Sequence, residues 1–182
     1  MNRFLLAATK LEIRIYGSEF KGLSVVKHPN GQEQEVVVFA KGYVAGITTA
    51  VNTIGLHELV FRSEKLLNET IVHEVTHKKE LHGPIYYLLA VLLPLGLWFA
   101  LSWVGLLVGF IIWWFAVQWF TEFRAYCQAI RTLGIQAVLE ARQDYLTLFE
   151  PSALIRIVGF SVTHPPLPLV IRICRLLHKD VH

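Results

Sequence analysis

The feature that most constrains this chain is its middle, which carries no Asp, Glu, Lys or Arg between Leu81 and Phe120. From Ile85 onward the stretch is dominated by leucine, valine, isoleucine, phenylalanine and tryptophan. One bilayer crossing needs about 20 apolar residues, with roughly 17 as the lower limit, so this stretch can supply two short helices. A turn near Ser102 would divide it evenly. The sequence therefore predicts a transmembrane helical hairpin over residues 84–120.

The rest of the composition fits one functional unit built around this hairpin. A chain of 182 residues is too short for two large domains joined by a linker. Its apolar fraction of 54% exceeds that of ordinary soluble domains, so we expect contact with the lipid bilayer. The net charge is only +3 and the basic residues are scattered, which argues against binding to nucleic acid.

The first third of the chain is predicted to form a small antiparallel sheet within an N-terminal part, residues 1–62. Charges interleave with apolar residues over positions 1–17, so no signal peptide is expected there. Alternating, β-branched segments predict strands over residues 11–16, 23–27 and 36–39, with a turn at 29–31. Residues 52–56 favour a further strand, suited to be the edge that aligns a peptide substrate.

An active-site helix is predicted over residues 63–83. Ser63 can cap its first turn, and Glu64 there interacts favourably with the positive end of the helix dipole. Gly83-Pro84 is expected to end the helix, because glycine suits a helix C-terminus and proline cannot continue the hydrogen-bond ladder.

This helix contains His73-Glu74-Val75-Thr76-His77, which has the pattern H-E-x-x-H. Residues i and i+4 differ by about 40° around a helix, so His73 and His77 project from one face and can bind a single Zn²⁺. Glu74 follows the first ligand directly. Its carboxylate is placed to take a proton from an attacking water and to return it to a leaving amine.

A catalytic zinc site usually has three protein ligands, so a third ligand is required. Glu122 is the best candidate, because it follows the hairpin at the start of a helix whose Ala125 permits close packing. Two crossings of the bilayer would return Glu122 to the side of the two histidines. Other candidates further along the chain remain open: Glu140, Asp144, Glu150 and His164.

The last part of the chain, residues 121–182, is predicted to be mostly helical. A helix should run over residues 121–149 with a weak point at Gly134, and Pro151 should interrupt it. Proline sterics favour an extended segment at 163–166, and a closing helix is expected over residues 169–177. Cys127 and Cys174 lack CxxC spacing, so we expect two buried free thiols.

The ordered set of motifs resembles the gluzincin family that includes HtpX and the CAAX prenyl endopeptidases. The resemblance covers roughly residues 50–177, and its motifs are these: the strand at 52–56, His73-Glu74-Val75-Thr76-His77, Glu122-Phe123-Arg124-Ala125, and Thr163-His164-Pro165-Pro166 followed by Arg172-Ile173. It implies a zinc-dependent endopeptidase of α+β fold, with a zincin-like helical catalytic unit and a hairpin between the second and third ligands. It also implies protein or peptide substrates in or near the bilayer, and an active-site role for His164 or Arg172, such as stabilising an oxyanion.

Two departures from the family pattern affect what can be carried over. Tyr126 stands where such families usually have an acidic residue, so the hydrogen bond that orients a ligand histidine must come from elsewhere or be missing. The N-terminal membrane helices of HtpX-like proteins are not predicted here, so the resemblance is to a minimal form.

Basic residues flank the hairpin on both sides: Lys78 and Lys79 precede it, and Arg124 and Arg131 follow it. The turn around Ser102 carries no charge. The positive-inside rule therefore predicts an integral membrane protein whose metal site faces the cytoplasm.

Two other functions are compatible with the H-E-x-x-H motif. A site-2-type intramembrane protease would place the motif inside a crossing and take an aspartate ligand from another, whereas Lys78 directly follows His77 and the apolar run contains no Asp. A membrane-anchored zinc sensor or scaffold without turnover would need no general base, and Glu74 argues against it.

Overall fold

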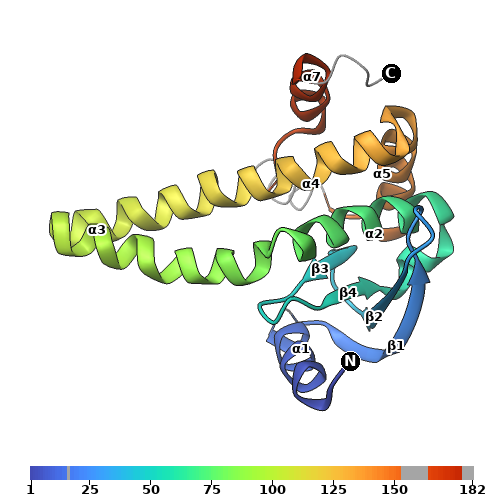
Figure 1. Cartoon of the computed structure of the whole chain (residues 1–182), viewed down its shortest axis with the longest axis horizontal. Coiled ribbons are helices and arrows are strands. Elements are labelled where there is room, and N and C mark those ends of the chain that lie inside the picture. Colours follow the sequence, from blue (N-terminus) through green and yellow to red (C-terminus); the bar gives the residue numbers. More distant parts are fainter. Residues whose placement is uncertain (16, 153–163, 178–182) are drawn as a thin grey trace.

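The computed structural model of the chain describes all residues except 16, 153–163 and 178–182. The fold is α+β, with a small mixed sheet and helices that make up most of the described residues. Figure 1 shows helix α2 between the sheet and helices α4 and α5, and a long helical hairpin that projects away from this body.

The sheet has the strand order β1-β2-β4-β3, and its strands are Glu19–Lys27 (β1), Glu33–Ala40 (β2), Gly46–Thr48 (β3) and Ile54–His57 (β4). The pairs β1–β2 and β3–β4 are antiparallel, but β2 and β4 are parallel. The prediction of an antiparallel sheet is therefore wrong for the central pair, β2 and β4. The strand predicted at 52–56 exists as β4, but it lies inside the sheet, and β3 forms the edge instead.

The predicted strand at residues 11–16 is also wrong, because the described part of this segment is the end of helix α1 (Arg3–Ile15). Tyr16 lies outside the described residues. Ile13 is buried against Val37 and Phe39 of strand β2, whereas Leu11 and Ile15 are exposed. Over so few residues, apolar and polar side chains can alternate in the same way in an amphipathic helix and in an amphipathic strand. The local sequence therefore did not distinguish the period of a helix from that of a strand.

Helix α2 (Glu64–Lys79) follows a short 3₁₀ helix, η1 (Glu58–Arg62), and begins as predicted. The Ser63 side chain caps α2 by accepting a hydrogen bond from the Leu66 backbone N–H. Residues 70–77 of α2 are all buried, because the sheet covers one side of the helix and α4 and α5 cover the other. Polar side chains in this run are thus enclosed, and they need partners within the protein.

The chain leaves α2 into the hairpin, which consists of α3 (His82–Ile112), the π-helical turn η2 (Trp113–Val117) and the start of α4 (Gln118–Leu133), whose remainder packs on α2. Helix α2 ends at Lys79, earlier than predicted, and Gly83-Pro84 lies in the first turn of α3. Proline is tolerated there because the first N–H groups of a helix have no intrahelical acceptor. The predicted turn is confirmed at Ser102, whose φ of 60° interrupts the helix.

The hairpin projects as two arms that run side by side (Figure 1). Within the described residues, the stretch Leu88–Leu133 is long and apolar enough to cross a membrane by length and composition. Only 11% of its most apolar window is buried by protein. Large side chains such as Phe99 and Trp103 are 80% and 72% exposed, so the arms present an apolar outer surface.

The returning arm has two glycines, Gly105 and Gly109, that allow the two arms to approach each other closely. A Cβ at Gly105 would overlap with the backbone carbonyl of Leu97, and one at Gly109 would lie 2.8 Å from the Pro94 Cα. The spacing G-x-x-x-G is typical of helices that pack closely in membranes.

We therefore expect Gly105→Ala to force the arms apart and to lower the free energy of unfolding by about 1–3 kcal/mol. Thermal unfolding of the purified chain in detergent measures this effect. Gly96→Ala is the matched control, because a Cβ at Gly96 meets nothing within 4 Å. Equal unfolding temperatures for the two variants would contradict the close packing of the arms.

Beyond the hairpin, Gly134 separates α4 from α5 (Ile135–Phe149), as predicted, and α7 (Leu167–Leu177) is the closing helix. Cys127 and Cys174 form a disulfide that joins α4 to α7, with a Cα–Cα distance of 6.0 Å. The expectation of two free thiols is therefore wrong. Both cysteines belong to one buried apolar cluster that includes Ile130 and Val170, and the packing of that cluster brings them together.

Candidate metal centre

Helix α2 presents His73 and His77 from one face, as the i, i+4 spacing predicts. Both imidazoles are buried, and their ring centroids are 4.7 Å apart. Burial lowers the pKa of His73 to about 4, because the charged imidazolium is disfavoured away from water. The neutral ring keeps a nitrogen lone pair available for a metal ion.

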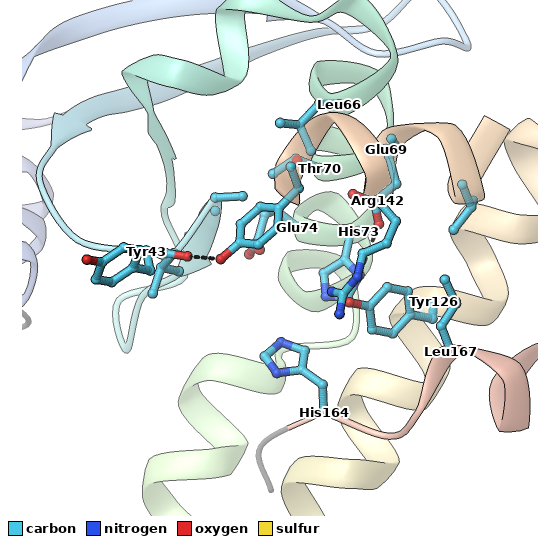
Figure 2. A pocket seen from close by; sticks show the side chains of 16 residues that line it. Tyr43, Leu66, Glu69, Thr70, His73, Glu74, Tyr126, Arg142, His164 and Leu167 are labelled. Carbon is cyan, nitrogen blue, oxygen red and sulfur yellow. Dashed lines mark hydrogen bonds and ion pairs between the residues drawn. The ribbon is translucent and has the colours of Figure 1, made fainter. Parts of the chain in front are cut away.

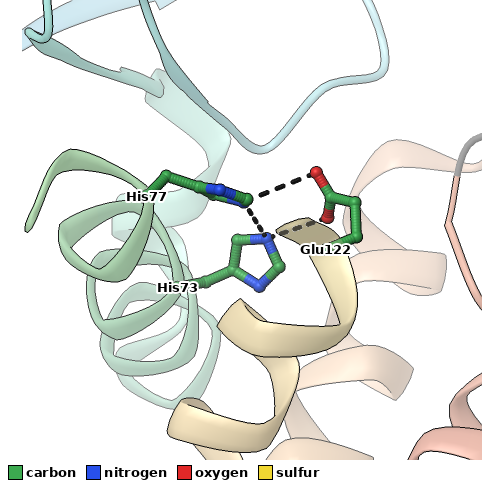
Figure 3. A group of neighbouring side chains, drawn as sticks. All are labelled: His73, His77 and Glu122. Atoms are coloured by element: carbon green, nitrogen blue, oxygen red, sulfur yellow. Dashed lines mark hydrogen bonds and ion pairs between the residues drawn. The ribbon is translucent and has the colours of Figure 1, made fainter. Parts of the chain in front are cut away.

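Glu122 of α4 completes a compact group with these two histidines (Figure 3). Its Oε2 lies 3.1 Å from the His73 Nε2, and its Oε1 lies 3.4 Å from the His77 Nε2. The two Nε2 atoms are 3.0 Å apart. The hairpin returns the chain to the side of α2, so the predicted third ligand faces the predicted first and second.

The donor set of this group fits a divalent metal ion. One ligand atom from each of His73, His77 and Glu122 lies within 4.8 Å of the others, so a single ion could contact all three. Two imidazoles and one carboxylate are a known ligand set of catalytic zinc sites. These residues could hold zinc or another divalent ion that accepts the same ligands.

Glu74 is held beside the cluster by the edge strand of the sheet. The Thr48 hydroxyl lies 2.9 Å from the Glu74 Oε2 and 3.0 Å from the Glu74 backbone carbonyl oxygen, both of which can accept its hydrogen bond. Burial raises the pKa of Glu74 to about 7, because the carboxylate is removed from water. A carboxyl group with such a pKa can both accept and donate a proton near neutral pH.

A cavity of about 230 Å³ opens beside His73 and Glu74. Figure 2 shows it from close by, with side chains that come from the segment before β3, from α2, α4 and α5, and from the segment before α7. Part of the cavity wall is apolar and is formed by Leu66, Val138 and Ala141. The rings of Tyr126 and His73 make an edge-to-face contact there, with a centroid distance of 4.7 Å. The cavity is large enough for a side chain and reaches the cluster directly.

The two residues that the resemblance adds to the site have different places. The His164 side chain points into the cavity, and its Nε2 lies 3.2 Å from the Glu122 Oε2. Arg172 is exposed on α7 and does not line the cavity. Thr163, the first residue of that motif, lies outside the described residues.

The other candidate carboxylate ligands lie away from the cluster. Glu140 pairs with Lys65 at 2.8 Å, and Asp144 accepts a hydrogen bond from the Ser63 hydroxyl. Glu150 follows the end of α5. Glu122 is thus the candidate carboxylate that the fold brings to the histidines.

Sequence reasoning missed four residues around the site: Thr48, Glu69, His82 and Arg142. Glu69 and Arg142 line the cavity, and the Glu69 Oε1 lies 4.0 Å from the His73 Nδ1, beyond hydrogen-bond distance. The position of Glu69 one turn before His73 on α2 was a signal that could have found it. No local pattern could have found Arg142, since only the packing of α5 brings it to α2.

Comparisons of this chain with protein-family models, with curated proteins and with solved structures find no match.

Proposed function

We propose that this protein is a membrane-embedded zinc endopeptidase with a zincin-like catalytic unit of the gluzincin type. The observation that carries the proposal is the convergence of His73, His77 and Glu122, with Glu74 held beside them at the mouth of a cavity. Glu74 has no hydrogen bond to either histidine among the described contacts, so a role as proton acceptor suits it better than a role in orienting the ligands. The active-site helix also lies in the body of the fold, outside the hairpin, unlike the motif helix of a site-2-type protease.

The residues of this chain have separable roles in the proposed reaction. When bound by His73, His77 and Glu122, zinc would polarise the scissile carbonyl and acidify water. Glu74 accepts a proton from the attacking water and returns it to the leaving amine. The Thr48 hydroxyl holds the Glu74 carboxylate in place for both transfers. The His164 ring lies beside the Glu122 carboxylate, as do the rings of His73 and His77. From this position it could stabilise a developing oxyanion.

The edge strand β3 offers a binding surface for the substrate backbone. No described strand pairs with the outer edge of β3, so a peptide could pair there and add one strand to the sheet. Gly46 of β3 lies against Glu74, so a peptide on this strand would pass close to the general base. The neighbouring cavity would then take one substrate side chain.

The hairpin would place this site at the surface of a bilayer. Each arm supplies about the 20 residues that one crossing needs, and its exposed side chains are apolar. Proposed substrates are therefore membrane proteins, or peptide segments near the membrane. The positive-inside rule predicts that the site faces the cytoplasm.

The purified chain in detergent is expected to contain one zinc ion and to cleave unstructured peptides. A chelator such as 1,10-phenanthroline should abolish cleavage, and added zinc should restore it, because the ligands remain in place. Elemental analysis and fluorogenic peptide libraries measure the two properties. A chain that binds no zinc, or that binds zinc and cleaves nothing in the library or in membrane extracts, would contradict the proposal.

Gly46→Ala is expected to impair cleavage without releasing zinc. A Cβ at this position would lie 2.7 Å from the Glu74 Cγ and 2.7 Å from the Thr70 Cγ2, so either the edge strand or the general base must move. Because a misplacement of about 1 Å can cost about 100-fold in rate, we expect a loss of that order. Gly22→Ala on β1, where a Cβ meets nothing within 4 Å, is the control.

A further inference from the structure

The ligand His77 has a hydrogen-bond partner on its far side, and that partner is a second histidine. The Nδ1 atoms of His77 and His82 are 2.7 Å apart, and both side chains are buried. The Nε2 of His82 lies 2.8 Å from the Glu80 Oε2. The Arg124 guanidinium binds both carboxylate oxygens of Glu80, at 2.7 and 3.2 Å.

Metal binding would determine which group donates and which accepts in each hydrogen bond of the series His77, His82 and Glu80. His77 must offer the lone pair of its Nε2 to the ion, so its proton stays on Nδ1 and is donated to the His82 Nδ1. His82 then carries its own proton on Nε2 and donates it to Glu80. The Glu80 carboxylate, which accepts hydrogen bonds only, suits the end of such a series.

We propose that His82 and Glu80 are positioning residues that orient His77 and strengthen its bond to the metal. Ligand histidines usually donate their second N–H to a carboxylate, carbonyl or water. Here a histidine polarised by a carboxylate takes that place. The inference rests on the proposed metal site and adds residues that the H-E-x-x-H pattern does not contain.

His73 differs from His77 in this respect. The His73 Nδ1 is buried and has no hydrogen-bond partner among the described residues. Within the described part of the chain, hydrogen bonds from outside the ligand set therefore reach the pair of histidines through His77. His82 begins α3 and Arg124 lies on α4, so this network also joins the two roots of the hairpin beside the metal site.

Three substitutions of His82 separate hydrogen bonding from packing. In His82→Asn, the amide oxygen can occupy the place of the Nδ1 and still accept from His77. In His82→Gln, the polar group falls near the former Nε2, so the contact with Glu80 is kept and the contact with His77 is lost. His82→Leu removes both contacts. His28→Leu is the control, since His28 is another buried histidine, on the sheet side of the fold.

Zinc affinity of the full chain in detergent, measured by competition with a chromogenic chelator, is the main readout. We expect His82→Leu and His82→Gln to weaken zinc binding about 10- to 100-fold. His82→Asn keeps the bond from His77 but loses Glu80, so its loss should be smaller, below about tenfold, and His28→Leu should stay within about threefold of the native chain. The absorption spectrum of the Co²⁺-substituted chain should shift in the first two variants only. A purely structural role would lower the unfolding temperature without producing this order of affinities.

Native affinity in both His82→Leu and His82→Gln would overturn the inference, and so would equal losses in His82→Asn and His82→Gln. In either case the native chain would still bind zinc, and the proposed peptidase would stand. A native chain that binds no zinc would instead contradict the proposed function itself, so the two failures are distinguishable.

Discussion

Replacing Glu74 with glutamine is expected to slow peptide cleavage strongly while zinc stays bound. The amide keeps the shape of the side chain and can still contact Thr48, but it cannot accept a proton from water. General-base catalysis is worth about 100- to 10 000-fold, so the turnover of Glu74→Gln should fall by that factor. Zinc content should not change, because the cluster consists of His73, His77 and Glu122.

Glu64→Gln is the matched control for this experiment. Glu64 lies on the same helix and undergoes the same chemical change, but it is exposed in the first turn. The control should keep native cleavage and native zinc. If Glu74→Gln cleaves as fast as the control, the general base is another residue. If neither Glu74→Gln nor the native chain cleaves any peptide, the zinc scaffold becomes the better reading.

Removal of the Glu122 carboxylate should have the largest effect on the metal. Glu122→Ala leaves two histidines, and the oxygens that lie 3.1 and 3.4 Å from their Nε2 atoms are lost. Loss of an outer partner alone costs about 10- to 100-fold in metal affinity, so loss of a ligand should exceed about 100-fold. Zinc stoichiometry after dialysis and chelator competition both measure this loss.

Glu140→Ala tests whether any carboxylate after the hairpin would give the same result. Glu140 pairs with Lys65 at the surface, away from the cluster, so this variant should bind zinc like the native chain. His164→Ala tests the remaining rival, because its ring also contacts Glu122. Tight zinc binding by Glu122→Ala together with metal loss in His164→Ala would show that His164, and not Glu122, is the third ligand.

The metal cluster could be predicted because its geometry is local or is constrained by topology. The i, i+4 spacing places His73 and His77 on one helix face whatever surrounds the helix. Glu122 was favoured by its place at the end of the apolar run, and the hairpin does return the chain to the side of α2 (Figure 1). The cap at Ser63 could be predicted from short-range chemistry, and the turn at Ser102 from the even division of the apolar run into two helices.

The features that could not be predicted depend on contacts between distant segments. The parallel pairing of β2 with β4 arises because the chain crosses over and adds β3 at the outside of β4, and no residue in either strand encodes this direction. The disulfide depends on how α7 packs against α4. His82 belongs to none of the motifs in the sequence, although its position five residues after His77 brings the two rings together across the α2–α3 bend.

The covalent link between α4 and α7 has a consequence for where this protein can work. Glutathione and thioredoxin keep most cytosolic thiols reduced, and stable cytosolic disulfides are common chiefly in hyperthermophiles. A cytoplasmic metal site and an intact Cys127–Cys174 bond are therefore compatible in a host with an oxidised interior. In other cells the bond is expected to persist mainly if this face is turned outward, so an intact Cys127–Cys174 bond there would argue against a cytoplasmic metal site.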